Sequence, residues 1–261
     1  MSTYWQDRAA ASLTKLSNKN IKAIEKELRK QYGRAMKRVL EDFENTYNKL
    51  LATLEDGKEA TPADLYKLDK YWQMQGQMRR ELQKLGDKHI QTMSKIFEIN
   101  FFDIYYSINI EGAVAFNTID KAAAMHIINS IWCADGKSWS QRIWDNVEKL
   151  QEVLNSKLIE CVATGKKTTE LKKLLQEQFN VSYRRADSIV RTEIAHIQTQ
   201  AAQQRYTDYG VEEVEIWADE DERRCPDCGK LHQKKYKVGE VVPIPRHPNC
   251  RCCIVPVIKK K

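Results

Sequence analysis

The C-terminal part of the chain concentrates side chains that could hold a metal ion. A Cys-x-x-Cys pair, Cys225 and Cys228, is followed after a gap of eighteen residues by a second element, His247-Pro-Asn-Cys-Arg-Cys-Cys253. A Cys-x-x-Cys pair places two thiolates on one side of a tight turn. A second Cys/His element beside it can complete a tetrahedral zinc site with sulfur and nitrogen ligands. This spacing predicts a zinc site that staples the end of the chain.

The second element offers more donors than a tetrahedral site needs. If residues 251–254 are extended, Cys250 and Cys252 face one side and Cys253 faces the other, because side chains alternate along a strand. Cys253 is therefore expected to be a small buried residue. The candidate ligands for about four coordination positions are Cys225, Cys228, His247, Cys250 and Cys252, and the sequence leaves open which four bind.

Two other interpretations of the cysteines are disulfide bonds and unrelated buried thiols. A disulfide framework would need an export signal, and residues 1–8 contain no apolar segment of the required length. Four mixed ligands indicate a closed structural site, whereas catalytic zinc keeps one position open. The zinc deaminase signature is excluded, because the chain has no His-x-Glu motif and has Cys225-Pro226 in the reverse order.

Positive charge gathers around the same cysteines. The chain has 43 basic and 36 acidic residues, and residues 225–261 hold nine of the basic and two of the acidic ones, so the whole excess of +7 lies there. A compact basic region suits phosphates or an acidic protein surface, and a solvated tail at Lys259–Lys261 is the alternative. The candidate nucleic-acid contacts are Lys230, Lys234, Lys235, Lys237, Arg246 and Arg251. No apolar run approaches the ~20 residues of a membrane span, so no membrane association is expected.

The rest of the chain has the pattern of amphipathic helices. Glycine and proline are few, at 10 and 6, and apolar residues recur three and four positions apart. We expect helices over residues 2–54, 62–85, 87–106, 120–132, 138–163, 168–179 and 182–210, with Thr61 capping the second. Beyond Gly210 the pattern alternates, which predicts strands over 214–216, 236–242 and 253–258 and an acidic turn over 219–222.

These elements predict a mainly α fold, with an elongated helical body and a small, zinc-stapled, β-rich C-terminal module. We expect an N-terminal helical region over residues 1–137, a second helical part over 138–210, and a basic Cys/His module over 211–261, here called the C-terminal module. The module has too few aliphatic residues for a core of its own, so its folding should depend on the metal.

Glu193 is an unusual residue within the last predicted helix. It falls on the apolar face formed by residues such as Val190 and Ile197, where a carboxylate is costly unless it is paired. We therefore expect a cationic or backbone N–H partner. The alternative is a catalytic acid, but no second carboxylate or nucleophile accompanies it, which favours a buried structural carboxylate. His196 is expected to be a packing residue.

The order of several motifs resembles the head-morphogenesis domain of tailed bacteriophages, the Mu F-like minor head proteins. The motifs are Arg191-Thr-Glu193, Tyr209-Gly-Val211, Trp217-Ala-Asp-Glu-Asp221, Cys225-Pro-Asp-Cys228 and His247-Pro-Asn-Cys-Arg-Cys252. Tyr4–Arg8 and Trp139–Trp144 are similar to patterns in full-length members. The resemblance assigns residues 138–210 to the helical part of that domain, and the extra Cys253 departs from the usual pattern.

The resemblance implies a minor capsid protein rather than an enzyme. Such a protein is located in the virion head near the portal, and in the host cytoplasm during assembly. Its expected partners are the phage portal protein, other capsid components and double-stranded DNA. Two alternatives come from the residues: a zinc-ribbon DNA-binding protein, and a metal-dependent hydrolase or toxin that uses Glu193 and His196.

Overall fold

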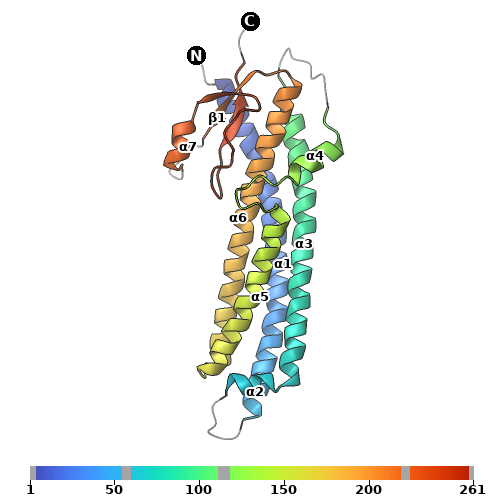
Figure 1. The fold of residues 1–261 in the computed structure, drawn as a ribbon, viewed down its shortest axis with the longest axis vertical. Helices are drawn as coiled ribbons and strands as arrows, with labels where there is room; N and C mark the ends of the chain where they lie inside the picture. Colours follow the sequence, from blue (N-terminus) through green and yellow to red (C-terminus); the bar gives the residue numbers. More distant parts are fainter. Residues whose placement is uncertain (1–3, 55–59, 111–117, 219–223, 259–261) are drawn as a thin grey trace. The chain divides into compact units, whose positions relative to one another are not determined.

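The computed structural model describes residues 4–54, 60–110, 118–218 and 224–258. The fold is mainly helical with a small antiparallel sheet near the C-terminus (Figure 1), which confirms the predicted class. The elements are α1 (Tyr4–Ala52), α2 (Pro62–Tyr66), α3 (Asp69–Ser107), α4 (Lys121–Ile128), α5 (Trp139–Ala163), α6 (Thr168–Asp208), β1 (Glu213–Trp217), α7 (Pro226–Leu231), β2 (Lys235–Lys237) and β3 (Cys253–Pro256). None of the described helices is apolar over the length that a membrane crossing requires.

Packing divides the chain into two compact units. The first comprises Met1–Glu25, Met93–Trp139 and Ser188–Lys261, and the second comprises Lys26–Thr92 and Ser140–Asp187. Helices α1, α3 and α6 contribute residues to both units. The division of the sequence into residues 1–137, 138–210 and 211–261 follows composition instead, and it stays a prediction.

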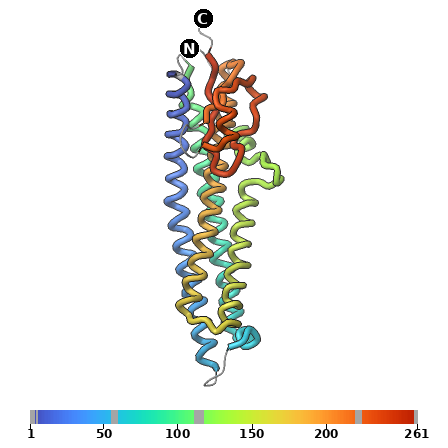
Figure 2. Tube along the Cα trace, turned by 90° about the vertical axis from the view of Figure 1, so that its left-hand side faces the viewer, coloured from blue at the N-terminus to red at the C-terminus, as the bar shows by residue number. Residues whose placement is uncertain are grey.

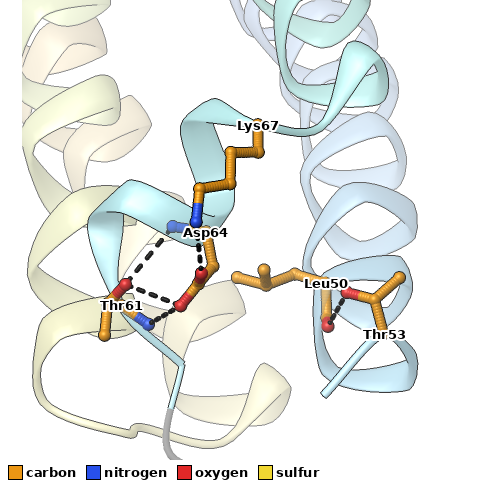
Figure 3. A network of polar contacts seen from close by, with 5 residues as sticks. All are labelled: Leu50, Thr53, Thr61, Asp64 and Lys67. Atoms are coloured by element: carbon orange, nitrogen blue, oxygen red, sulfur yellow. Dashed lines mark hydrogen bonds and ion pairs between the residues drawn. The ribbon is translucent and has the colours of Figure 1, made fainter.

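Helix α2 begins with the cap that the sequence predicts. The Thr61 side chain accepts a hydrogen bond from the Asp64 N–H, and the Asp64 carboxylate accepts one from the Thr61 N–H, which makes a capping box (Figure 3). Pro62 occupies the first turn, where its missing N–H costs nothing. The helix ends at Tyr66, however, and Lys67 is its C-cap. The Lys67 side chain extends toward the start of the helix, where its Nζ atom lies 3.3 Å from Oδ1 of Asp64. The expectation of one helix over 62–85 was therefore wrong.

The predicted helix break at Gly86 was also wrong, because α3 runs continuously from Asp69 to Ser107. The reason for the glycine is tertiary. A Cβ atom at Gly86 would lie 2.5 Å from Cζ3 of the Trp144 ring on α5, far inside van der Waals contact. Gly86 is thus the place where an indole ring packs directly on a helix backbone.

We expect Gly86→Ala to destabilise the protein by about 1–3 kcal/mol, although alanine is the better helix former, because the rigid Trp144 ring must move. Gly33→Ala is the matched control: it also lies inside a long helix, but a Cβ there meets nothing within 4 Å. It should stabilise by about 0.4–1 kcal/mol. Urea denaturation of both variants measures the difference, and equal effects would exclude the packing explanation.

A third difference concerns α6, which is one helix from Thr168 to Asp208 rather than two. Ser182, expected to cap the second, lies buried inside it. Its hydroxyl is 3.3 Å from the Tyr32 hydroxyl of α1, and its backbone oxygen accepts a hydrogen bond from Asn146 of α5 at 2.9 Å. Tertiary partners therefore satisfy a serine that local propensity would place at a helix end.

The sheet of the C-terminal module has the order β2-β1-β3, with both outer strands antiparallel to β1. Strand β1 pairs Val214 with Tyr236 on β2 and with Pro256 on β3. Strand β2 ends at Lys237 instead of residue 242, because the chain turns at once: the Glu240 N–H donates to the Lys237 oxygen, and Gly239 has φ +92°. The predicted turn over 219–222 and the tail over 259–261 lie outside the described residues.

The C-terminal module packs on the C-terminal part of α6. The Tyr206 hydroxyl of α6 donates to the backbone oxygen of Ile254 on β3 at 3.2 Å, and both residues are buried. Figure 2 shows the module, in red, beside this part of α6, in orange. The motif-bearing helix and the cysteines are therefore parts of one packed structure.

Candidate metal centre

The first two cysteines lie at the start of a short helix. Cys225 is the N-cap of α7, and its Sγ accepts a hydrogen bond from the Cys228 N–H at 3.3 Å. Pro226 occupies the first turn, where it favours the helical backbone. The sequence Cys-Pro-Asp-Cys therefore folds so that the two sulfur atoms face the same side.

His247 presents its ring to both of these sulfurs. Its Nε2 atom is 3.2 Å from Cys225 Sγ and 3.3 Å from Cys228 Sγ, while its Nδ1 atom is 2.9 Å from the Pro248 carbonyl oxygen. Nδ1–H donates to that carbonyl, so Nε2 is left with a free lone pair directed at the cysteines. A backbone carbonyl that orients a ligating histidine in this way is common at metal sites.

Cys250 and Cys252 complete a second group that shares Cys228 with the first. The ligand atoms of Cys225, Cys228 and His247 lie within 4.8 Å of one another, and so do those of Cys228, Cys250 and Cys252. All five predicted ligands thus converge on one place. Cys253, on β3, is buried and belongs to neither group, which matches its predicted role as a packing residue.

The geometry of this cluster fits a tetrahedral metal ion. Cys228 Sγ and Cys250 Sγ are 3.8 Å apart, and a tetrahedron with ~2.3 Å metal–sulfur bonds has a sulfur–sulfur edge of about 3.8 Å. Three of its thiols are buried, and they cannot all ionise at this spacing unless a cation compensates their charge. The cluster could therefore bind a metal ion.

The acid–base properties of the thiols reflect the same crowding. Hydrogen bonding from Cys252 lowers the pKa of the Cys250 thiol to about 5, whereas burial raises the pKa of Cys228 to about 12. Cys250 is therefore favoured as a thiolate, whereas Cys228 stays protonated. A divalent cation would reverse this balance by drawing every ligating sulfur into the thiolate form.

Two residues of α6 hold the second element in place, and the sequence did not identify this contact. The Asn249 N–H donates to Thr192 Oγ1 at 3.0 Å, and Asn249 Nδ2 donates to Ser188 Oγ at 3.1 Å. Asn249 has φ +60°, a left-handed conformation that asparagine adopts more readily than most residues. Two features of the sequence could have indicated this contact: the asparagine between His247 and Cys250, and the two hydroxyl residues, Ser188 and Thr192, that lie four positions apart on one helix.

We expect Thr192→Val to lower the metal affinity up to about tenfold and to raise protease cleavage in the C-terminal module, because the Asn249 N–H loses its acceptor. Competition with a chelator measures the affinity. Thr207→Val is the control, since Thr207 is on the same helix and its hydroxyl donates to the Gln203 carbonyl oxygen one turn earlier, away from the cluster. An affinity equal to that of the control would mean that the contact does not position the turn.

The neighbours of Thr192 contact two other segments. Arg191 forms an ion pair with Glu25 of α1. Glu193 is 1% exposed and accepts a hydrogen bond from the Trp132 indole at 2.9 Å. The Trp132 ring also stacks on buried His196, with 4.2 Å between ring centroids. The Arg-Thr-Glu motif therefore joins α1, the turn that carries His247 and Cys250, and the segment before α5. The Trp132 indole N–H is one donor to Glu193, and the expected cationic or backbone N–H partner stays a prediction.

One comparison with known proteins found a family. The model of the family described as Phage Mu protein F like protein matches residues 152–255. These residues are a Mu F-like domain. The Mu F-like proteins are a head morphogenesis family of phages, a structural family that is generally not enzymatic. Searches of curated proteins and of solved structures each found no match.

The Mu F-like domain contains both parts of the site described above. It runs from within α5, through all of α6, to β3, so it includes the Arg-Thr-Glu motif and every candidate ligand. The resemblance inferred from the motif order is thereby confirmed.

The basic residues of the Mu F-like domain are distributed over its surface. All six predicted nucleic-acid contacts, Lys230, Lys234, Lys235, Lys237, Arg246 and Arg251, have exposed side chains. Lys230 pairs with Asp227 at 3.3 Å and Lys235 with Glu215 at 3.7 Å. Their role in nucleic-acid binding stays a prediction.

Proposed function

We propose that this protein is a minor capsid protein of a tailed phage, which acts in head assembly and associates with the portal protein. The observation that carries the proposal is the Mu F-like match over residues 152–255. It is supported by the coincidence of that match with the Cys/His cluster and with the motif that anchors it. The helical remainder of the chain offers surface for contacts with other capsid components.

In this proposal the cluster holds a structural zinc ion. Sulfur and imidazole donors with a tetrahedral edge length favour zinc over calcium or magnesium, which prefer oxygen ligands. Zinc would supply folding free energy to a module whose sheet has only three short strands. The residues that would hold it are four of Cys225, Cys228, His247, Cys250 and Cys252.

The proposal includes no catalytic step. Glu193 and His196, the two residues considered for hydrolysis, are 1% and 6% exposed. The Trp132 side chain contacts both, through a hydrogen bond to Glu193 and ring stacking on His196. These contacts favour a structural role for both side chains over one at an open metal ion.

Mass spectrometry of purified procapsids and mature particles tests the assignment to the virion. We expect the protein in both, in few copies relative to the major capsid protein, and we expect the portal protein to co-purify with it. Absence from both kinds of particle would rule out the proposed function.

Contact with packaged DNA is the second part of the proposal. We expect Lys234→Ala/Lys237→Ala/Arg246→Ala to weaken binding of a random-sequence duplex and to reduce the salt dependence by up to about three ion equivalents, since each phosphate contact releases counterions. The control, Lys26→Ala/Lys88→Ala/Lys173→Ala, removes equal charge from exposed helix positions. Equal losses in both variants would show attraction by net charge alone.

A further inference from the structure

A hollow of about 940 Å³ lies in the first unit, between the N-terminal part of α1 and the end of β1. Its walls from β1 are Trp217 and the adjoining Ala218. The α1 side consists of one acidic residue, Asp7, of the small or polar residues Ala10, Ala11, Thr14 and Asn18, and of three basic residues, Lys15, Lys19 and Lys22. We call this feature the α1–β1 groove.

The three lysines form a single row along one wall of the groove. Their spacing of four and three residues puts them on the same helix face, over a length of about 10 Å. All three are exposed. Over the part of the chain that the structure describes, three carboxylates of α1 pair with other cations: Glu25 with Arg191, Glu27 with Lys30 and Glu41 with Lys37. No described carboxylate pairs with Lys15, Lys19 or Lys22.

The chemistry of the groove favours carboxylates over a nucleic acid strand. Among the described residues that line it there is no arginine, so these residues offer none of the planar guanidinium groups that bind a phosphate through two parallel hydrogen bonds. Trp217, the one aromatic residue among the described residues of the lining, is 9% exposed and packs edge-on against the His232 ring at 5.0 Å. A base therefore has no open ring on which to stack.

The dimensions indicate an extended peptide. In a strand, alternate side chains point the same way and are about 6.7 Å apart, close to the ~6 Å rise between two helix positions four residues apart. Carboxylates on alternate residues would therefore meet the lysine row in order. The alanines and the aliphatic parts of the lysines provide an apolar floor for the peptide backbone.

We propose that the α1–β1 groove is a docking site for an acidic segment of a partner protein, bound in an extended conformation with carboxylates on alternate residues. This site is separate from the Cys/His cluster, and the proposal does not depend on the proposed function. It predicts that binding is electrostatic, weakens with salt and requires the three lysines together.

The probe is a fluorescein-labelled, acetylated and amidated peptide of about eight residues with glutamate at alternate positions. Its binding to the full chain, purified with its metal, is measured by fluorescence anisotropy at low salt. We expect Lys15→Ala/Lys19→Ala/Lys22→Ala to weaken binding about tenfold or more, from three cooperating ion pairs. The control Lys26→Ala/Lys30→Ala/Lys37→Ala removes equal charge from the same helix and should change affinity less than about twofold.

Carbodiimide coupling gives a second measurement, because it joins peptide carboxylates to nearby lysine amines. Mass spectrometry should locate the coupled peptide on Lys15, Lys19 or Lys22. The proposal fails if both triple variants lose affinity equally, if the wild-type chain does not bind the peptide, or if a single-stranded oligonucleotide of equal charge binds more tightly through the same lysines.

One further variant tests for a competing occupant within this chain. The residues after Ala218 are acidic in sequence, from Asp219 to Glu222. If replacing these four by their amides tightens peptide binding about tenfold or more, the groove belongs to the chain's own acidic segment, and the proposal of an external partner is overturned. An unchanged affinity supports it.

Discussion

Replacing Cys228 with serine is expected to release the bound metal and unfold the C-terminal module, while the helices keep their structure. Cys228 belongs to both groups of ligand atoms, so its loss breaks each of them. Structural zinc supplies about 10 kcal/mol or more to the folding of small modules, and a core of three short strands cannot replace that contribution.

Three measurements on one preparation check this result. Elemental analysis should find about one zinc per wild-type chain and much less in the variant. Circular dichroism at the helical minimum should change little. Limited proteolysis should cut the variant after Gly210, in the segment that the wild-type protein protects.

Cys161→Ala is the matched control, because it removes a buried cysteine that lies outside the cluster, in α5. It should keep its metal and its protease resistance. A wild-type protein that contains no metal and still protects its C-terminal module would contradict the metal centre altogether.

Acid is expected to destabilise the second unit through His89 on α3. This side chain is fully buried beside Tyr32, with 6.3 Å between the ring centroids. Neither of its ring nitrogens has a hydrogen-bond partner among the described residues. Burial lowers the pKa of His89 from 6.5 to about 3, because a charged imidazole would lose its hydration without compensation.

The direction of the pH effect follows from where the protons bind. Between about pH 3 and pH 6.5 the unfolded chain holds a proton on His89 that the folded chain does not. Unfolding therefore takes up a proton, and stability falls as the pH falls through this window, by about 1.4 kcal/mol per pH unit. At pH 4.5 the loss is about 2–3 kcal/mol, and above pH 6.5 it vanishes.

We expect His89→Leu to remove this part of the acid sensitivity and to stabilise the protein by about 1 kcal/mol at neutral pH, since leucine leaves no unsatisfied nitrogen in the core. Urea denaturation of both proteins at several pH values measures the difference between them. His126→Gln, which removes an exposed histidine of α4, controls for the loss of one histidine. Parallel pH profiles for wild type and His89→Leu would contradict the prediction.

Local patterns in the sequence predicted the elements whose causes are local. The capping box at Thr61, the helix over most of residues 4–52, and the change to strands after Gly210 follow from neighbouring residues alone. The convergence of the Cys/His cluster was also predictable, because ligand chemistry restricts both the residue types and their spacing.

The failures of prediction share one physical reason. Gly86 and Ser182 look like helix ends because glycine and serine disfavour helix interiors, yet α3 and α6 continue through them. In each case a residue distant in sequence, Trp144 for the glycine and Tyr32 for the serine, supplies contacts that outweigh a local preference of about 1 kcal/mol.

The sequence by itself thus determined the mainly helical class, the Mu F-like identity of residues 152–255 and the residues of the Cys/His cluster that could hold a metal ion. Only the tertiary structure decided that Thr192 and Ser188 hold Asn249, that Trp132 serves Glu193, and that three lysines of α1 face the end of β1. The spacing of residues along the chain predicts which side chains share one face of a helix or strand, or lie together in one turn. Contacts between distant segments depend on how whole helices pack, and no short pattern encodes that.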